Sequence, residues 1–212
     1  MPAARKRMRR KKMKGKRSRP CFYVKYLVLH IFFVSLHAKA KRPPRRCTTW
    51  ASSYRTKMNK GTKKRILFVC HGNICRSPMA EFVMKDLVKK ARLEDRFLIE
   101  SAATSTEEIG NSVYPPARRK LAEHGISCAG KTARQMTRSD YDRYDLLIGM
   151  DSWNIRNMRN ICGGDPEGKI VMLMDFTHRP GDVADPWYTG NFEATWRDVL
   201  EGCQALLDRF AK

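Results

Sequence analysis

The sequence predicts an α/β fold, in which a single domain is built on a parallel sheet with helices around it. From Arg65 onward, short apolar runs alternate with longer stretches of helical character, the pattern of strand–helix–strand units. The runs at residues 66–69 and 146–150 are apolar throughout, as expected for strands that are buried on both faces. The 212-residue chain is long enough for one such core and additional segments.

Four runs in this part of the chain are predicted strands. Each is short, and together they are rich in the β-branched and large apolar residues that strands favour. The predicted strands are residues 66–69, 97–101, 146–150 and 170–173.

Helices are expected between these strands and after the last one. The predicted helices are residues 79–90, 116–123, 152–159 and 192–210. Pro78 stands at a permitted first-turn position, Gly125 can end the second helix, and Asp151 can cap the third. The last helix is predicted from apolar residues three or four apart, a stripe that packs against a sheet and forms core.

Basic residues are concentrated at the N-terminus. Residues 1–57 contain 19 of the 43 Lys and Arg residues and no Asp or Glu. Residues 58–212 therefore contain 24 basic and 21 acidic residues, a net charge of only +3 out of the total of +22. Nucleic-acid binding needs basic groups to neutralise phosphates, so no nucleic-acid partner is expected for the folded part.

The cysteines indicate a reducing compartment. Their number is odd and their spacing irregular, unlike a disulfide framework or a zinc site with paired CxxC spacing. They are Cys21, Cys47, Cys70, Cys75, Cys128, Cys162 and Cys203. We therefore expect a cytoplasmic protein with no bound metal.

Residues 1–57 are interpreted as an extension outside the folded domain, which we place at residues 58–212. The apolar stretch at residues 21–38 is short for a membrane-spanning helix and contains Lys25, so membrane insertion is not favoured. A secretory signal is an alternative, because residues 38–40 have the small-x-small pattern of a cleavage site. If the first 40 residues are a real targeting segment, the protein is exported or membrane-tethered.

The residues from Cys70 to Pro78 follow a buried strand and precede a helix, where open α/β sheets bind their ligands. Five residues separate Cys70 from Arg76. The N–H groups of such a loop can turn inward, and the following helix adds the positive end of its dipole. The sequence therefore predicts an anion-binding loop.

The residue types in this loop suit phosphoryl transfer. The amide groups and Arg76 favour the thiolate of Cys70, which is the nucleophilic form. The planar Arg76 guanidinium can hold two phosphate oxygens, and Ser77 can donate to the sulfur as it leaves. Gly72 allows close approach to the loop backbone, and Asn73 tolerates left-handed dihedral angles.

The competing interpretation is that Cys70 is an inert buried thiol and Arg76 a surface charge. It would be the better choice for a lone cysteine, because unpaired cysteines are commonly buried. The Cys-x5-Arg-Ser spacing between a strand and a helix argues against it. A Walker-type nucleotide loop is excluded, because the Gly-Lys-Ser/Thr ending is missing.

Residues 69–81, VCHGNICRSPMAE, resemble the signature of the low-molecular-weight protein tyrosine phosphatase family. Residues 185–188 resemble the general-acid loop of that family, and residues 101–105 and 133–135 resemble two further segments, so the resemblance covers about residues 65–210. It implies a four-stranded parallel sheet flanked by helices, of the Rossmann-like, phosphatase I type. It also implies hydrolysis without metal or other cofactor, through a cysteinyl-phosphate intermediate.

Carried over residue by residue, the resemblance implies three catalytic residues. Cys70 would be the nucleophile, Arg76 the phosphate clamp and Asp185 the general acid. Ser77 would stabilise the thiolate and Asn73 would organise the loop. The other implied substrate or phosphate contacts are His71, Gly72, Ile74, Cys75, Trp187 and Tyr188.

Chemistry supports Asp185 and an aromatic substrate independently. The leaving oxygen of a phosphotyrosine needs a proton, and the same carboxylate can then take one from the attacking water. A lone Asp-Pro is more often a turn start, but Trp187 and Tyr188 follow it and can form walls for a phenyl ring. The expected partner is a phosphotyrosine-containing protein or a small aryl phosphate, bound by a monomer or weak homodimer.

Three alternatives remain open. The first is phosphoarginine hydrolysis, although the related phosphoarginine phosphatases carry Thr at the position of Ile74. The second is arsenate reduction, which needs further cysteines that Cys128 and Cys162 do not obviously supply. The third is a module that binds phosphotyrosine without hydrolysis. The resemblance also implies that Cys75 can form a protective disulfide with Cys70, giving reversible inactivation by peroxide.

Overall fold

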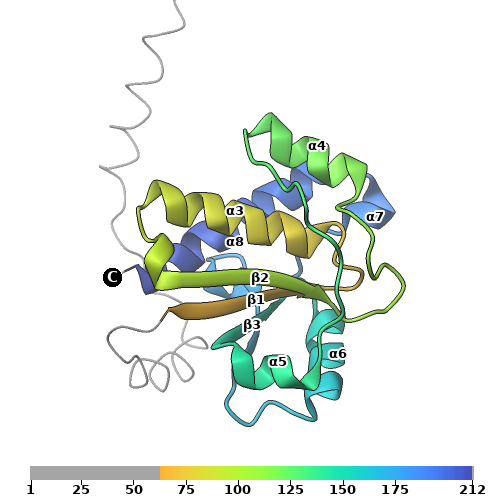
Figure 1. The fold of residues 1–212 in the computed structure, drawn as a ribbon, viewed down its shortest axis with the longest axis vertical. Coiled ribbons are helices and arrows are strands. Elements are labelled where there is room, and N and C mark those ends of the chain that lie inside the picture. The colour runs from red at the N-terminus through yellow and green to blue at the C-terminus, as the bar shows by residue number, and fades with distance from the viewer. Residues whose placement is uncertain (1–62, 212) are drawn as a thin grey trace, which may run out of the picture. The chain divides into compact units, whose positions relative to one another are not determined.

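The computed structural model describes residues 63–211, in which four parallel strands form one sheet (Figure 1). The strands are β1 (Lys64–Cys70), β2 (Phe97–Ala103), β3 (Leu146–Gly149) and β4 (Ile170–Met172). They lie in the order β2-β1-β3-β4, and every neighbouring pair is parallel. The predicted α/β class and four-stranded parallel sheet are confirmed, while β1 and β2 are longer than expected.

Six α-helices and two short 3-10 helices accompany the sheet in residues 63–211. The α-helices are α3 (Arg76–Lys90), α4 (Pro115–Glu123), α5 (Arg138–Arg143), α6 (Ser152–Cys162), α7 (Pro186–Thr189) and α8 (Phe192–Phe210). The 3-10 helices are η3 (Glu94–Arg96) and η4 (Leu173–Phe176).

Several predicted boundaries need correction, two of them by one residue: β3 ends at Gly149 and not at Met150, and α4 begins at Pro115 and not at Pro116. Helix α3 begins at Arg76 and not at Met79, since Pro78 is accommodated within the first turn, where its missing N–H costs no helical hydrogen bond. Helix α6 runs on to Cys162 and ends at Gly163, which adopts a left-handed conformation with φ 75°. Leu173, predicted to end β4, is the first residue of η4.

The two faces of the sheet pack against different helices. In β1, Ile66 and Phe68 belong to a core shared with α3, α4 and α8, whereas Leu67 and Val69 belong to a second core with α5 and α6. Figure 1 shows these two helical layers on opposite sides of the sheet. Successive side chains of a strand point to opposite faces, so burial on both faces explains the uninterrupted apolar runs.

The topology places a ligand-binding crevice at the carboxyl end of β1. The chain passes from β1 to β2 on one side and later returns to β3 on the other, which makes the end of β1 a switch point. The segments that follow β1, β2 and β3 therefore meet at one edge of the sheet.

The expectations for the N-terminal extension lie outside residues 63–211. Within the described part of the chain, none of the helices has the length and apolar character needed to cross a membrane. The apolar stretch at residues 21–38 is not among the described residues.

Candidate active site

Cys70 is the last residue of β1, and its sulfur is surrounded by hydrogen-bond donors. The side chain is buried, with Sγ 3.0 Å from the Ser77 hydroxyl oxygen. The backbone N–H of Asn73 donates to the same sulfur at 3.3 Å. These contacts place the sulfur against one hydroxyl and one amide N–H.

Asn73 fixes the shape of the loop. Its φ of 58° lies in the left-handed region, as expected for asparagine at a tight loop. Its side-chain amide donates to the hydroxyls of Ser77 at 2.9 Å and Ser101 at 2.8 Å, and its carbonyl oxygen accepts the backbone N–H of Arg134 at 3.2 Å. The two further segments of the family resemblance therefore both reach the loop through Asn73.

A buried carboxylate, which was not predicted from the sequence, extends this network. Ser101 donates its hydroxyl to Glu81 at 2.5 Å, and Lys131 forms an ion pair with Glu81 at 3.1 Å. Glu81 is buried, so it needs these partners to offset the loss of water. Hydrogen bonds therefore link Glu81 to Ser101, Ser101 to Asn73, and Asn73 to Ser77. This network holds in place the Ser77 hydroxyl that contacts the Cys70 sulfur.

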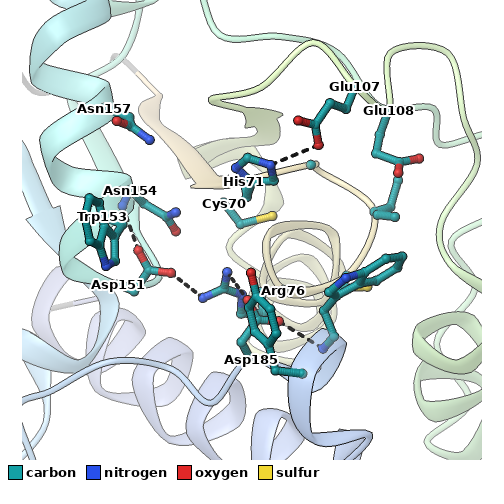
Figure 2. A pocket seen from close by; sticks show the side chains of 15 residues that line it. Cys70, His71, Arg76, Glu107, Glu108, Asp151, Trp153, Asn154, Asn157 and Asp185 are labelled. Atoms are coloured by element: carbon teal, nitrogen blue, oxygen red, sulfur yellow. Dashed lines mark hydrogen bonds and ion pairs between the residues drawn. The ribbon is translucent and has the colours of Figure 1, made fainter.

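Arg76 lies between two aspartates. Its Nη1 donates to Asp151 Oδ2 at 2.5 Å, and its Nη2 lies 2.5 Å from Asp185 Oδ2 (Figure 2). Burial alone would lower the pKa of Arg76, but the negative charges of Cys70 and Asp185 and the hydrogen bond to Asp151 raise it above its ordinary value. The guanidinium is therefore a permanent cation next to the Cys70 loop.

Asp151 has two functions that the sequence analysis only half predicted. Its Oδ1 accepts the backbone N–H of Asn154 at 2.6 Å and so caps α6, as expected. Its Oδ2 accepts from Arg76, which was not expected. The available signal was its position two residues after the end of β3, which runs parallel to β1.

Asp185 begins a helical turn where a loop was predicted. It is the N-cap of α7 and accepts the backbone N–H of Trp187 at 3.0 Å. Trp187 and Tyr188 are 59% and 86% exposed, so they are not core residues. The Trp187 ring packs on Tyr114 with centroids 5.6 Å apart, which leaves its other surface available.

A pocket of about 540 Å³ opens above the sulfur, within the size range of small-molecule sites. It is lined by the predicted residues Cys70, His71, Gly72, Ile74, Cys75, Arg76, Asp185, Trp187 and Tyr188. It is also lined by residues that sequence reasoning missed: Glu107, Glu108, Asp151, Trp153, Asn154 and Asn157. Asn73 and Ser77 are buried and support the loop from below.

Two further loop residues, His71 and Cys75, have different surroundings. His71 Nε2 lies 3.1 Å from a carboxylate oxygen of Glu107, which links the Cys70 loop to the segment after β2. Burial, together with the negative charges of Cys70 and Asp185, raises the pKa of Cys75 to about 12. Cys75 is therefore a neutral thiol at pH 7, and both it and Cys70 are free here.

No cluster of three or more His, Cys, Asp or Glu residues suited to a metal ion occurs among residues 63–211. The polar groups around the Cys70 sulfur are the Asn73 backbone N–H, the Ser77 hydroxyl and the nearby Arg76 guanidinium. Such donors match an oxyanion.

The fold and the pocket define an α/β domain with a Cys-x5-Arg anion loop at the end of its first strand. The family model described as low molecular weight phosphotyrosine protein phosphatase matches residues 65–212. The chain belongs to this family, which confirms the resemblance noted in the sequence.

Individual relatives agree with this assignment. The chain is 40% identical over 149 residues to the low molecular weight protein-tyrosine-phosphatase YfkJ of Bacillus subtilis, covering 69% of this chain and 96% of that protein. It is 36% identical over 157 residues to the low molecular weight phosphotyrosine protein phosphatase of Gallus gallus, covering 72% and 99%.

Solved structures show the same fold. The crystal structure of YfkJ from Bacillus subtilis superimposes with a TM-score of 0.70 at 39% identity, covering 72% of this chain and 98% of that one. The phosphatase SP-PTP from Streptococcus pyogenes gives 0.63 at 42% identity, covering 69% and 93%. DARP, a Drosophila arginine phosphatase, gives 0.64 at 28% identity, covering 69% and 98%.

Proposed function

We propose that this chain is a protein tyrosine phosphatase that hydrolyses phosphotyrosine and small aryl phosphates through a cysteinyl-phosphate intermediate. The observation that carries the proposal is the meeting of three groups in one pocket: the buried sulfur of Cys70, the guanidinium of Arg76 and the carboxylate of Asp185. They supply a nucleophile, an anion clamp and a proton donor, the groups that the reaction needs.

In the first step the Cys70 thiolate attacks phosphorus and forms the S–P bond. The bond from phosphorus to the tyrosine oxygen breaks, and Asp185 gives its proton to that oxygen. In the second step water attacks phosphorus, the S–P bond breaks, Asp185 takes a proton from the water, and inorganic phosphate leaves. The Ser77 hydroxyl, 3.0 Å from the sulfur, stabilises the Cys70 thiolate as the S–P bond breaks in this second step.

A substrate panel tests the proposal. Trp187 and Tyr188 flank a pocket whose floor a phosphotyrosine could reach and a shorter phosphoserine could not. We expect hydrolysis of phosphotyrosine peptides at least ~100-fold faster, in kcat/KM, than of matched phosphoserine peptides, because of this difference in reach. Equal rates on both, or no phosphate release from any aryl phosphate, would contradict the proposal.

The same panel addresses the alternatives. The similarity to the arginine phosphatase DARP makes phosphoarginine the first competitor. Against it, the branched side chain of Ile74 lines the pocket where a guanidinium would have to fit. Arsenate reduction has less support, since Cys128 and Cys162 are buried in the two separate cores and neither lines the pocket.

The role of Asp185 predicts a dependence on the leaving group. We expect Asp185→Ala to lower kcat/KM for phenyl phosphate by about 10²-fold or more, because general acid catalysis typically contributes that much. An aryl phosphate with a strongly acidic phenol needs no proton and should lose much less. Equal losses for both substrates would show that Asp185 is not the acid.

We propose further that residues 58–212 form the catalytic domain and that residues 1–57 are not needed for catalysis. A protein that starts at Met58 is expected to fold and to have the kcat of the full chain, because the described fold and pocket use residues from 63 onward. Loss of folding or activity would contradict this boundary. We also propose a cytoplasmic location, in line with the free cysteines of residues 63–211. A monomer or weak homodimer is proposed as the state in solution.

A further inference from the structure

Trp153 is an exposed aromatic residue at the mouth of the catalytic pocket. It is the second residue of α6, its side chain is 67% exposed, and it lines the pocket. Figure 2 shows it next to Asp151 on α6, on the opposite side of the pocket from Glu107 and Glu108. Exposed large apolar side chains at the rim of a pocket commonly mark a recognition surface.

We propose that Trp153 is a specificity-determining residue that contacts an apolar side chain next to the phosphotyrosine of a protein substrate. The inference rests on the proposed phosphatase function. Asp151 positions Arg76, and Trp153 follows two residues later on the same helix. The ring therefore lies close to the phosphate-binding floor but at the rim, where residues flanking the phosphotyrosine would pass.

The fold does not depend on this tryptophan. The N-terminus of α6 is capped by Asp151 through the N–H of Asn154, and the buried residues of α6 are Asn154, Met158 and Cys162. The Trp153 ring makes a cation–π contact with Arg156, which lies one turn further along the same exposed face of α6. A structural role would require burial that the side chain does not have.

The charges around the ring select an apolar occupant. The Arg156 guanidinium lies 5.7 Å from the centre of the Trp153 ring, so it repels a second cation at that position. The Asp151 carboxylate, two residues before Trp153, lines the same side of the pocket and disfavours an anion beside the ring. An uncharged apolar side chain gains contact with the indole without either penalty.

The test measures kcat and KM of the full-length protein and its variants on phosphotyrosine peptides and on phenyl phosphate. The peptides carry Leu, Lys or Glu on both sides of the phosphotyrosine. Trp153→Ala is expected to lower the ratio of kcat/KM for the Leu peptide to that for phenyl phosphate by about 10-fold, equivalent to about 1.4 kcal/mol. The loss should appear as a higher KM for the peptide, with its kcat retained.

Two further variants separate recognition from general damage. Trp153→Phe keeps an apolar ring and should retain most of the preference for the Leu peptide. Leu98→Ala removes an exposed apolar side chain from β2, away from the pocket lining, and should leave the ratio at its wild-type value. Thermal unfolding of each variant checks that the fold is intact.

The outcomes distinguish the two levels of the proposal. An unchanged ratio in an active Trp153→Ala enzyme, or a larger loss for the Lys or Glu peptide than for the Leu peptide, overturns the assignment of Trp153 alone. Failure of the wild-type protein to hydrolyse phenyl phosphate overturns the proposed function and this inference with it.

Discussion

Replacing Cys70 with serine is expected to lower kcat for aryl phosphates by about 10⁴-fold or more, as removal of a covalent nucleophile typically does. A serine hydroxyl is a far weaker acid than a thiol, so Arg76 and the loop amides cannot hold it as an anion at pH 7. It is also a poor leaving group for the second step. Phosphate binding should survive, because the donors around the sulfur remain.

The measurement combines steady-state rates with calorimetric titration of inorganic phosphate. Acid quenching of the wild-type enzyme during turnover should also trap a phosphoryl group on the peptide that contains Cys70. Cys162→Ser is the matched control, since this cysteine is buried in the second core and does not line the pocket. A Cys70→Ser variant with a normal rate, or a trapped adduct on another residue, would remove the basis of the proposed mechanism.

The sheet was predictable because its strands are buried on both faces. The strands β1 and β3 contain uninterrupted apolar runs, which are typical of strands in the middle of a parallel sheet. Helices α5 and α7 were missed because six and four residues are too few to show an apolar period. The N-cap Asp185 and Pro186 at the first helical position were both visible signals of α7, but the same pair is equally typical of a turn.

The anion loop was predictable for a different reason, namely that its parts are contiguous. The residues from Cys70 to Ser77 that make the cradle, with the single inversion of φ at Asn73, are adjacent in the chain. Glu81 and Asp151 support the loop through partners that are 20 and 75 positions away in the sequence. Only the tertiary fold shows that Asp151 uses one oxygen to cap a helix and the other to hold Arg76.

The second large effect is expected at Arg76, where lysine should keep the charge but lose the geometry. We expect Arg76→Lys to lower kcat/KM for aryl phosphates by about 10³-fold, comparable to the loss of an arginine that stabilises a transferring phosphoryl group. The guanidinium reaches Asp151 with one nitrogen and Asp185 with the other, while a lysine has a single nitrogen. Lysine could therefore bind either the phosphate or Asp151, but could not stay oriented by Asp151 while holding two phosphate oxygens.

Measuring kcat and KM separately distinguishes a clamp from a simple positive charge. A charge alone would be replaced by lysine, so both parameters would stay near their wild-type values. A planar clamp that follows the equatorial oxygens acts most strongly in the transition state, so kcat should fall much further than KM rises. Arg179→Lys is the control, because Arg179 forms ion pairs with Asp198 and Glu201 at an exposed position outside the pocket lining. If Arg76→Lys retained the wild-type kcat, phosphate recognition at this site would depend on charge and on the loop amides, and the planar fork would have no catalytic role.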